Sequence, residues 1–301
     1  MPLAHLYFVA SAFLLALGSV WVKALLSSRD TIIDPLPFLT LQLIGGVAFL
    51  IAVQGARGWR GVDFPPLARP AVAGVILGVG SVGTIMALAS IPASEASVIF
   101  ATQPIVIIAL ARLLLGERIA RAVLVLSLVG VAGVGGIVIG GSGFDTTGRS
   151  LGVALALLST VCAAIYVVWM RRLSGSTSVL ATLIIVQSTA CLVAASVTAL
   201  STATALSAAH FGDGSSMLAA AGTGVLYYGM AFYVYLLGLR TTEASIAGVY
   251  LNLVPVFTIA LASATLSERL SPTQWIAASI VITAVTSIAI TAPRERRPKR
   301  T

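Results

Sequence analysis

Pairs of polar or aromatic residues stand three positions apart inside apolar stretches of this sequence. Ser81 and Thr84 form one pair, and Phe232 and Tyr235 form another. Residues at this spacing share one face of a helix. Their hydroxyls and aromatic rings could bind a neutral, zwitterionic or aromatic solute, and no acid–base or metal-ligand cluster accompanies them. The pattern therefore indicates a binding cavity and no catalytic site.

The same spacing occurs at Gly18 and Trp21 and at Tyr166 and Trp169. We expect the four helices that carry these pairs to line one cavity. Another interpretation stays open, because a Ser or Thr hydroxyl can bond a carbonyl of its own helix and aromatic rings can simply pack. Trp21 and Trp169 also lie near the ends of their stretches, where Trp often marks the membrane interface.

Two prolines, Pro104 and Pro255, interrupt apolar stretches. Each lacks a backbone N–H and should free the carbonyl four residues earlier, at Phe100 and Leu251. Inside a membrane a freed carbonyl needs a partner, which a cavity or a solute can supply. Hydrogen bonds between helices, worth about 0.6 kcal/mol in a membrane, are the alternative. Polar residues beside the breaks are further candidates for binding, namely Thr102, Gln103, Tyr250 and Asn252, and the same two interpretations apply to Gln42 and Gln187.

Charged residues avoid the middle of every apolar stretch. Glu95 and Glu243 lie at stretch ends, so we find no buried carboxylate of the kind that compact proton-coupled multidrug antiporters need. Glu95 could be a gate on the outer side or an interfacial cap. Basic residues that could hold a phosphate also lie near the ends, where they can reach the interface: Lys23, Arg112, Arg171 and Arg240. We expect an uncharged, aromatic cavity, no cofactor and no metal ion.

The elements that must position these residues are membrane-spanning helices. Hydrophobic residues make up 58% of the 301 positions and charged residues only 9%, against about 25% charged residues in soluble proteins. The apolar stretches are long enough to span a membrane as helices, and they do not alternate as barrel strands do. We predict an all-α polytopic membrane protein with ten spans, at residues 4–26, 35–54, 70–90, 93–115, 121–140, 150–170, 178–200, 216–239, 243–266 and 273–292.

Basic residues predict the orientation. With the N-terminus inside, fourteen of the 18 Lys and Arg residues fall on the inner side and four on the outer side. The positive-inside rule therefore places both termini in the cytoplasm and requires an even number of spans. The expected location is the inner (plasma) membrane, with several passes through it.

The sequence consists of two similar halves. A shift of 151 residues superposes Pro104 on Pro255, and a shift of 148 superposes Trp21 on Trp169. Five spans are an odd number, so the halves should lie upside down relative to each other. Inverted repeats of this kind are typical of secondary transporters, because two similar halves can exchange conformations and open a central site to either side.

One motif occurs once in each half: Ala-Ser-x-Ala-x-Val, then Pro, then Glu thirteen residues after the Pro, beginning at Ala93 and at Ala244. With the duplication, it resembles the EamA family of the drug/metabolite transporter superfamily over essentially the whole chain. Leu115-Gly116-Glu117 keeps the family's usual Leu-Gly-Glu, whereas Ser267 departs from it. The resemblance implies ten helices and export of metabolites, commonly amino acids, drugs or related compounds, with the aromatic amino acid exporters as the nearest group.

We therefore expect one transmembrane domain made of a first five-helix repeat, 1–142, and a second, 143–301. It would export small metabolites, amino acids among them, by alternating access, as a monomer or homodimer without enzymatic activity. Its partners would be the solute and the lipid bilayer, and the net charge of +8 needs no nucleic acid to explain it. Drug export is the alternative within this class, while a structural membrane protein and a passive channel are rivals outside it. Gly78-Val-Gly80-Ser-Val-Gly83 spells a dinucleotide motif, but inside a span it predicts close helix packing instead.

Overall fold

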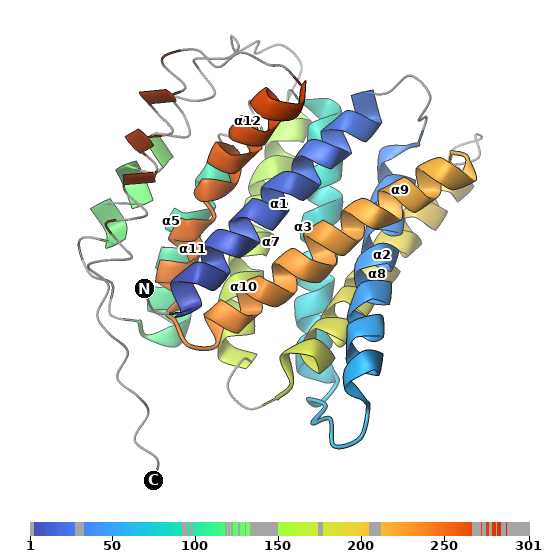
Figure 1. The fold of residues 1–301 in the computed structure, drawn as a ribbon, viewed down its shortest axis with the longest axis horizontal. Helices are drawn as coiled ribbons and strands as arrows, with labels where there is room; N and C mark the ends of the chain where they lie inside the picture. Colours follow the sequence, from blue (N-terminus) through green and yellow to red (C-terminus); the bar gives the residue numbers. More distant parts are fainter. Residues whose placement is uncertain are drawn as a thin grey trace.

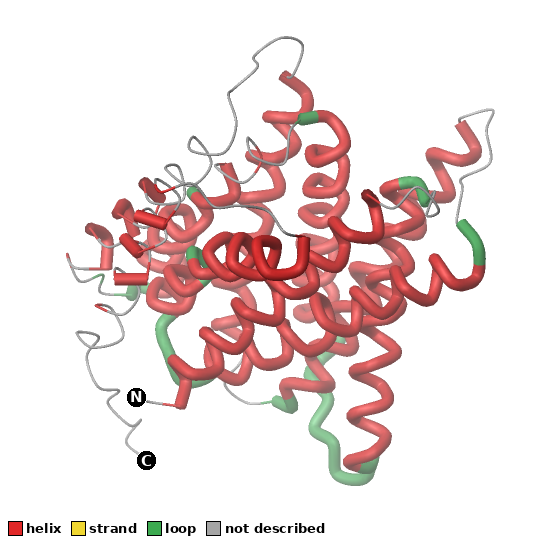
Figure 2. Tube along the Cα trace, turned by 45° about the horizontal axis from the view of Figure 1, so that its top comes forward, coloured by secondary structure: helices red, strands yellow, loops and turns green. Residues whose placement is uncertain are grey.

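Uninterrupted apolar runs form the long helices of a bundle, shown as a computed structural model in Figure 1. The structure describes residues 3–27, 33–91, 99–117, 150–173, 177–204 and 212–266, with isolated positions between 96 and 132 and between 272 and 287. Within these ranges the chain is helical apart from turns and short loops, as the tube in Figure 2 shows. The all-α prediction is confirmed for this part of the chain.

Among the described residues, six helical segments are long and apolar enough to cross a membrane. Each coincides with a predicted span. Five are single α-helices, and the sixth runs from α9 through the π-helix η2 into α10. Their bounds are α1 Leu3–Ser27, α2 Pro35–Arg57, α3 Ala68–Ser90, α7 Ser150–Leu173, α8 Val179–Thr204, α9 Gly214–Gly224, η2 Val225–Ala231 and α10 Phe232–Leu239.

Two other predicted spans are interrupted helices. The fourth has a turn at Thr102, followed by α5 (Gln103–Leu110) and the π-helix η1 (Ala111–Leu115). The ninth is divided into α11 (Ala244–Tyr250) and α12 (Leu253–Leu266). The fifth and tenth predicted spans lie largely outside the described residues, so the total of ten and the orientation of the termini stay predictions.

The two halves interleave. From the first half, α3 packs against α7 and α8, and α2 packs against α8 and α9, all from the second half. Each contact has a counterpart made by the equivalent helices of the other half. The α3–α7 contact corresponds to α10–α1, the α3–α8 contact to η2–α2, and the α5–α7 contact to α12–α1. A duplicated fold with a two-fold relation between its halves produces this pairing. The surfaces between the halves consequently meet at the centre of the bundle.

Glycines bring α2 and α9 into contact through their backbones. A methyl group on Gly224 would overlap the carbonyl group of Gln42, and one on Gly45 would overlap that of Ala221. Small residues allow this close approach, which supplies van der Waals contact that lipid cannot. The contact lies about midway along both spans and joins the first half to the second.

The predicted packing role of the glycine motif in α3 is confirmed. A side chain on Gly78 would meet Ala190 of α8, and one on Gly80 would meet Cys162 of α7. The motif therefore fits α3 closely against two helices of the second half.

Large apolar side chains cover the outside of the bundle. Leu113, Leu192 and Leu218 are exposed over 77%, 67% and 75% of their surfaces. In water such a surface would be an aggregation site, whereas lipid tails solvate it. The polar residues that could act on a solute are therefore to be sought between the helices.

Candidate functional site

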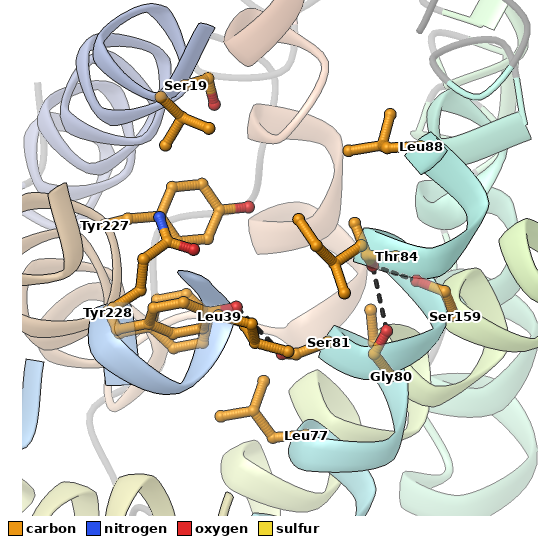
Figure 3. A pocket seen from close by; sticks show the side chains of 15 residues that line it. Ser19, Leu39, Leu77, Gly80, Ser81, Thr84, Leu88, Ser159, Tyr227 and Tyr228 are labelled. Carbon is orange, nitrogen blue, oxygen red and sulfur yellow. Dashed lines mark hydrogen bonds between the residues drawn. The ribbon is translucent and has the colours of Figure 1, made fainter. Parts of the chain in front are cut away.

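A cavity of about 230 Å³ lies between the halves, toward the end of the bundle where α1 and α3 end and α2 and α7 begin. We name this the cavity end. Tyr227 and Thr84 stand on opposite sides of the cavity in Figure 3. None of the described residues that line it is charged: Ser19, Val22, Leu39, Gln42, Leu77, Gly80, Ser81, Thr84, Ile85, Leu88, Ser159, Ala163, Tyr227, Tyr228 and Phe232.

Hydrogen bonds fix the hydroxyl groups on the α3 wall (Figure 3). Thr84 Oγ1 donates to the carbonyl oxygen of Gly80 at 3.0 Å and lies 2.5 Å from Ser159 Oγ. Since the Thr84 proton is used at Gly80, Ser159 must be the donor in this pair. The hydroxyl of Tyr228 donates to Ser81 Oγ at 3.1 Å. Ser81 therefore accepts one bond, and its own proton can be donated to another acceptor.

The π-helix η2 brings two neighbouring tyrosines into the cavity wall. Tyr227 and Tyr228 of this π-helix both line the cavity, with ring centroids 5.0 Å apart. Gln187 of α8 donates to the backbone carbonyl of Tyr228 at 3.2 Å and so ties the wide turn to a neighbouring helix of the same half. Single π-turns inside helices are frequent at functional sites.

Four candidate residues, Ser81, Thr84, Phe232 and Gln42, line this cavity together. The two tryptophans lie elsewhere, which corrects the expectation that they line the same cavity. Trp21 is 40% exposed, and its ring lies beside Gly222 of α9. Trp169 donates to the carbonyl of Arg69 at 3.2 Å, near the end of the bundle opposite the cavity. Both lie near the ends of their helices, as residues of a membrane interface do.

Aromatic rings fill the space between the halves next to the cavity, toward the opposite end. Tyr166 packs on Phe232 with ring centroids 5.7 Å apart, and Phe8 packs on Tyr235 and Tyr250 at 5.4 and 5.3 Å. We name these five residues the aromatic cluster. The predicted site residues Tyr166, Tyr235 and Tyr250 thus lie beyond the cavity wall and do not line the cavity in this structure.

Hydroxyl groups in the aromatic cluster differ in their partners. Tyr250 is 1% exposed, and its hydroxyl lies 2.6 Å from Nδ1 of His5. Tyr166 and Tyr235 are 3% and 6% exposed, and their hydroxyls have no hydrogen-bond partner among the described residues. A buried hydroxyl without a partner costs about 1–3 kcal/mol. The last two hydroxyls therefore weaken this packed state.

At the first helix break, the hydroxyl of Thr102 donates to the carbonyl of Ile99 at 2.6 Å. Pro104 lies in the first turn of α5, where a missing N–H is tolerated. Thr102 and Gln103 are partly buried and do not line the cavity. The candidate gate Glu95 lies outside the described residues.

At the second break, the expectation of a free carbonyl at Leu251 is wrong. The backbone N–H of Val254 donates to it at 3.0 Å, because the chain makes a tight turn before α12 and Pro255 falls inside the first turn of that helix. Asn252 in this turn is 2% exposed, and its Nδ2 has no partner among the described residues. It lies near the aromatic cluster through its neighbour Tyr250 and not in the cavity wall.

Four polar or aromatic lining residues escaped prediction from the sequence: Ser19, Ser159, Tyr227 and Tyr228. A signal for Ser159 was present, because it stands seven residues before Tyr166 on one face of the same helix. Tyr228 gave a signal of the same kind, because it stands four residues before Phe232. Tyr227 has no such spacing to a predicted site residue.

Charged residues meet at the opposite end. Arg171 of α7 donates to the carbonyls of Leu239 and Arg240, at 3.0 and 2.8 Å, where α10 ends. Glu243 lies in the loop before α11. Burial raises the pKa of the Glu243 carboxyl, the charge of Glu117 raises it further, and the charge of Arg171 lowers it. This end is thus held by ionisable groups that the cavity end lacks in its lining.

Spanning helices in two interleaved halves, with an uncharged cavity between them, define a multi-pass membrane protein built to hold a small solute. The EamA-like transporter family matches the sequence at residues 2–139 and 150–290, once in each half. The chain belongs to this family of membrane transporters, and the resemblance seen in the motifs is confirmed. A solved structure, titled "Crystal structure of protein", shares the fold with a TM-score of 0.80 and 23% sequence identity, over 96% of this chain and 97% of its own. Comparison with curated proteins gives no match.

Proposed function

We propose that the protein is a secondary transporter that exports small metabolites, above all amino acids with neutral or aromatic side chains, by alternating access. The observation that carries this proposal is the uncharged cavity between the halves, lined by hydroxyls and by three aromatic rings. A structural membrane protein has no need of such a cavity.

The size of the cavity favours amino acids over drugs. Pockets for drug-sized ligands measure roughly 300–1,000 Å³, whereas this cavity measures about 230 Å³. A solute of amino-acid size fits this space without a change in the helices. Aromatic side chains would gain further from the rings of Tyr227, Tyr228 and Phe232, which can pack against them edge to face.

The absence of charge from the described lining favours solutes without net charge. A solute with net charge would leave water and meet no opposite charge, which is costly. A zwitterion has no net charge, and its two charged groups can be bound by dipoles. The Ser81 proton can go to a carboxylate, and the amide oxygen of Gln42 can accept from an ammonium group.

The orientation that the basic residues predict completes the proposal. With both termini in the cytoplasm, the cavity end faces the outside, and the end with Arg171 and Glu243 faces the cytoplasm. The structure then corresponds to a state with its cavity on the outer side and its inner side packed shut by the aromatic cluster.

Transport by the purified protein in proteoliposomes tests the function. We expect saturable uptake of labelled phenylalanine and leucine that excess unlabelled solute blocks, and little uptake of lysine or glutamate. Thr84→Val should raise the KM, because it removes a hydroxyl from the cavity wall at nearly constant shape. Thr202→Val, on α8 and outside the lining, is the matched control. Flux that rises linearly with concentration and shows no competition would identify a passive channel and overturn the proposal.

A further inference from the structure

The duplicated sequence gives the polar wall of the cavity a counterpart at the opposite end. The shift of 151 residues carries Thr84 of α3 onto Tyr235 of α10, and the shift of 148 carries Ser11 of α1 onto Ser159 of α7. The hydroxyl pair Thr84–Ser159, which faces the cavity, therefore corresponds to the pair Tyr235–Ser11. The exchange of halves seen in the helix contacts places this second pair between α10 and α1.

At the counterpart position the space is filled and the hydrogen bonds are incomplete. Ser11 Oγ donates to the carbonyl of Ala231 at 2.9 Å. Ala231 corresponds to Gly80, whose carbonyl accepts the Thr84 hydroxyl on the cavity side. Tyr235 has a longer side chain than Thr84, and its buried hydroxyl has no partner among the described residues.

Tyr166 repeats this situation from the facing helix. Its ring packs on Phe232, a cavity residue, while its buried hydroxyl also lacks a partner among the described residues. Phenylalanine would pack as well at both positions without the cost of an unpaired hydroxyl. Two such hydroxyls, on two helices of the second half and next to the cavity, call for a ligand that is absent in the packed state.

We propose that Tyr166 and Tyr235 form a second half-site, whose phenolic hydroxyls bind the polar groups of the solute when the aromatic cluster separates at the end opposite the cavity. The inference rests on the proposed function, because this half-site opens only in a transporter that alternates between its two ends. Phenolic hydroxyls both donate and accept, so the half-site suits the carboxylate and ammonium groups of an amino acid. The cavity binds the same solute through the aliphatic hydroxyls of Ser81 and Thr84, and the two faces should therefore differ in affinity.

Kinetics measured separately from each face test the half-site. Tyr166→Phe and Tyr235→Phe each remove one hydroxyl and keep the ring. In membrane vesicles of the two orientations, right-side-out and inside-out, the KM at the face opposite the cavity should rise roughly tenfold for each variant, as expected for loss of a hydrogen bond to a charged group. The KM at the cavity face should stay within about twofold of the wild-type value.

Tyr228→Phe is the matched control. Its hydroxyl bonds Ser81 in the cavity wall, so this variant should raise the KM at the cavity face and leave the other face unchanged. Thermal unfolding in detergent checks that all three variants fold, and loss of an unpaired buried hydroxyl should not lower the midpoint for Tyr166→Phe or Tyr235→Phe.

The outcomes separate the two proposals. Wild-type protein that transports, with an unchanged KM at both faces in the folded Tyr166→Phe and Tyr235→Phe variants, overturns the half-site alone. An equal rise of the KM at both faces also overturns the half-site, because the two hydroxyls would then not belong to a site that opens at one face. Wild-type protein that carries no amino acid in either orientation overturns the proposed function and the half-site with it.

Discussion

Glu117 holds Ser245 across the boundary between the two halves. One carboxylate oxygen accepts the Ser245 hydroxyl at 2.7 Å and the Ser245 backbone N–H at 3.1 Å, and the other accepts the backbone N–H of Ala244 at 2.8 Å. A carboxylate at a helix N-terminus satisfies free N–H groups and is favoured by the helix dipole. A residue of the first half thus caps α11 of the second half at the end opposite the cavity.

We predict that this cap couples the two residues energetically. Glu117→Ala and Ser245→Ala should each lower the midpoint of thermal unfolding in detergent, and the double variant should lose less than the sum of the two. A double-mutant cycle should give a coupling of about 1 kcal/mol, the usual worth of such a cap. Additive effects would show that the contact contributes nothing to stability.

We predict a pH dependence of stability from Glu243. Its pKa is raised in the folded protein, first by burial, from an ordinary value of 4.5. A raised pKa means that Glu243 contributes stability below about the ordinary value and that this contribution is lost as the pH rises through the raised one. The unfolding midpoint of the wild-type protein should fall across this window, relative to that of Glu243→Gln, which has no carboxyl to titrate. Parallel pH profiles for the two proteins would contradict the assignment.

The backbone contact between α2 and α9 predicts a position that tolerates no side chain. Gly224→Ala should destabilise the protein by about 1–3 kcal/mol, the usual cost of overpacking, because the methyl group overlaps the carbonyl of Gln42. Gly214→Ala is the control on the same helix, since an added side chain there meets no other atom within 4 Å. Yield of folded protein and unfolding midpoint measure both effects, and equal midpoints for the two variants would refute the close contact.

The different locations of two aromatic residues predict different effects on transport. Phe232→Ala should raise the KM for phenylalanine more than the KM for leucine, because Phe232 lines the cavity and can pack on an aromatic solute. Trp169→Ala should leave both values unchanged, since its ring lies near the opposite end beside Arg69. A larger effect at Trp169 than at Phe232 would place the solute away from the cavity.

The spans were predictable from the sequence because membrane solvation imposes a long apolar run on every helix that crosses. Hydropathy predicted α1, α2, α3, α7 and α8 almost to their ends, and the duplication explained why they pack across the halves. Hydropathy could not reveal η2, because a π-turn changes the backbone hydrogen-bond partners without a change in amino-acid composition.

For the candidate site, the sequence predicted only which residues share one face of a helix. Ser81 and Thr84 share a face that points between the halves, and both line the cavity. Tyr235 stands on the equivalent face of the second half and is nevertheless packed shut. Sequence spacing gives the direction in which a side chain points but not which end of a two-ended path is open. Trp21 and Trp169 were misplaced for a related reason. Their spacing to other residues predicts a shared helix face but does not predict how close to the end of the bundle they lie.

The glycine contact between α2 and α9 limits how this protein can move. Two helices that touch through their backbones have no side chains between them to repack, so their separation there is fixed. It lies at the level of the cavity, because Gln42 belongs both to this contact and to the cavity wall. A change of conformation that keeps this contact would turn the two halves about it. Gly45 and Gly224 would then lie on the axis about which the two halves turn.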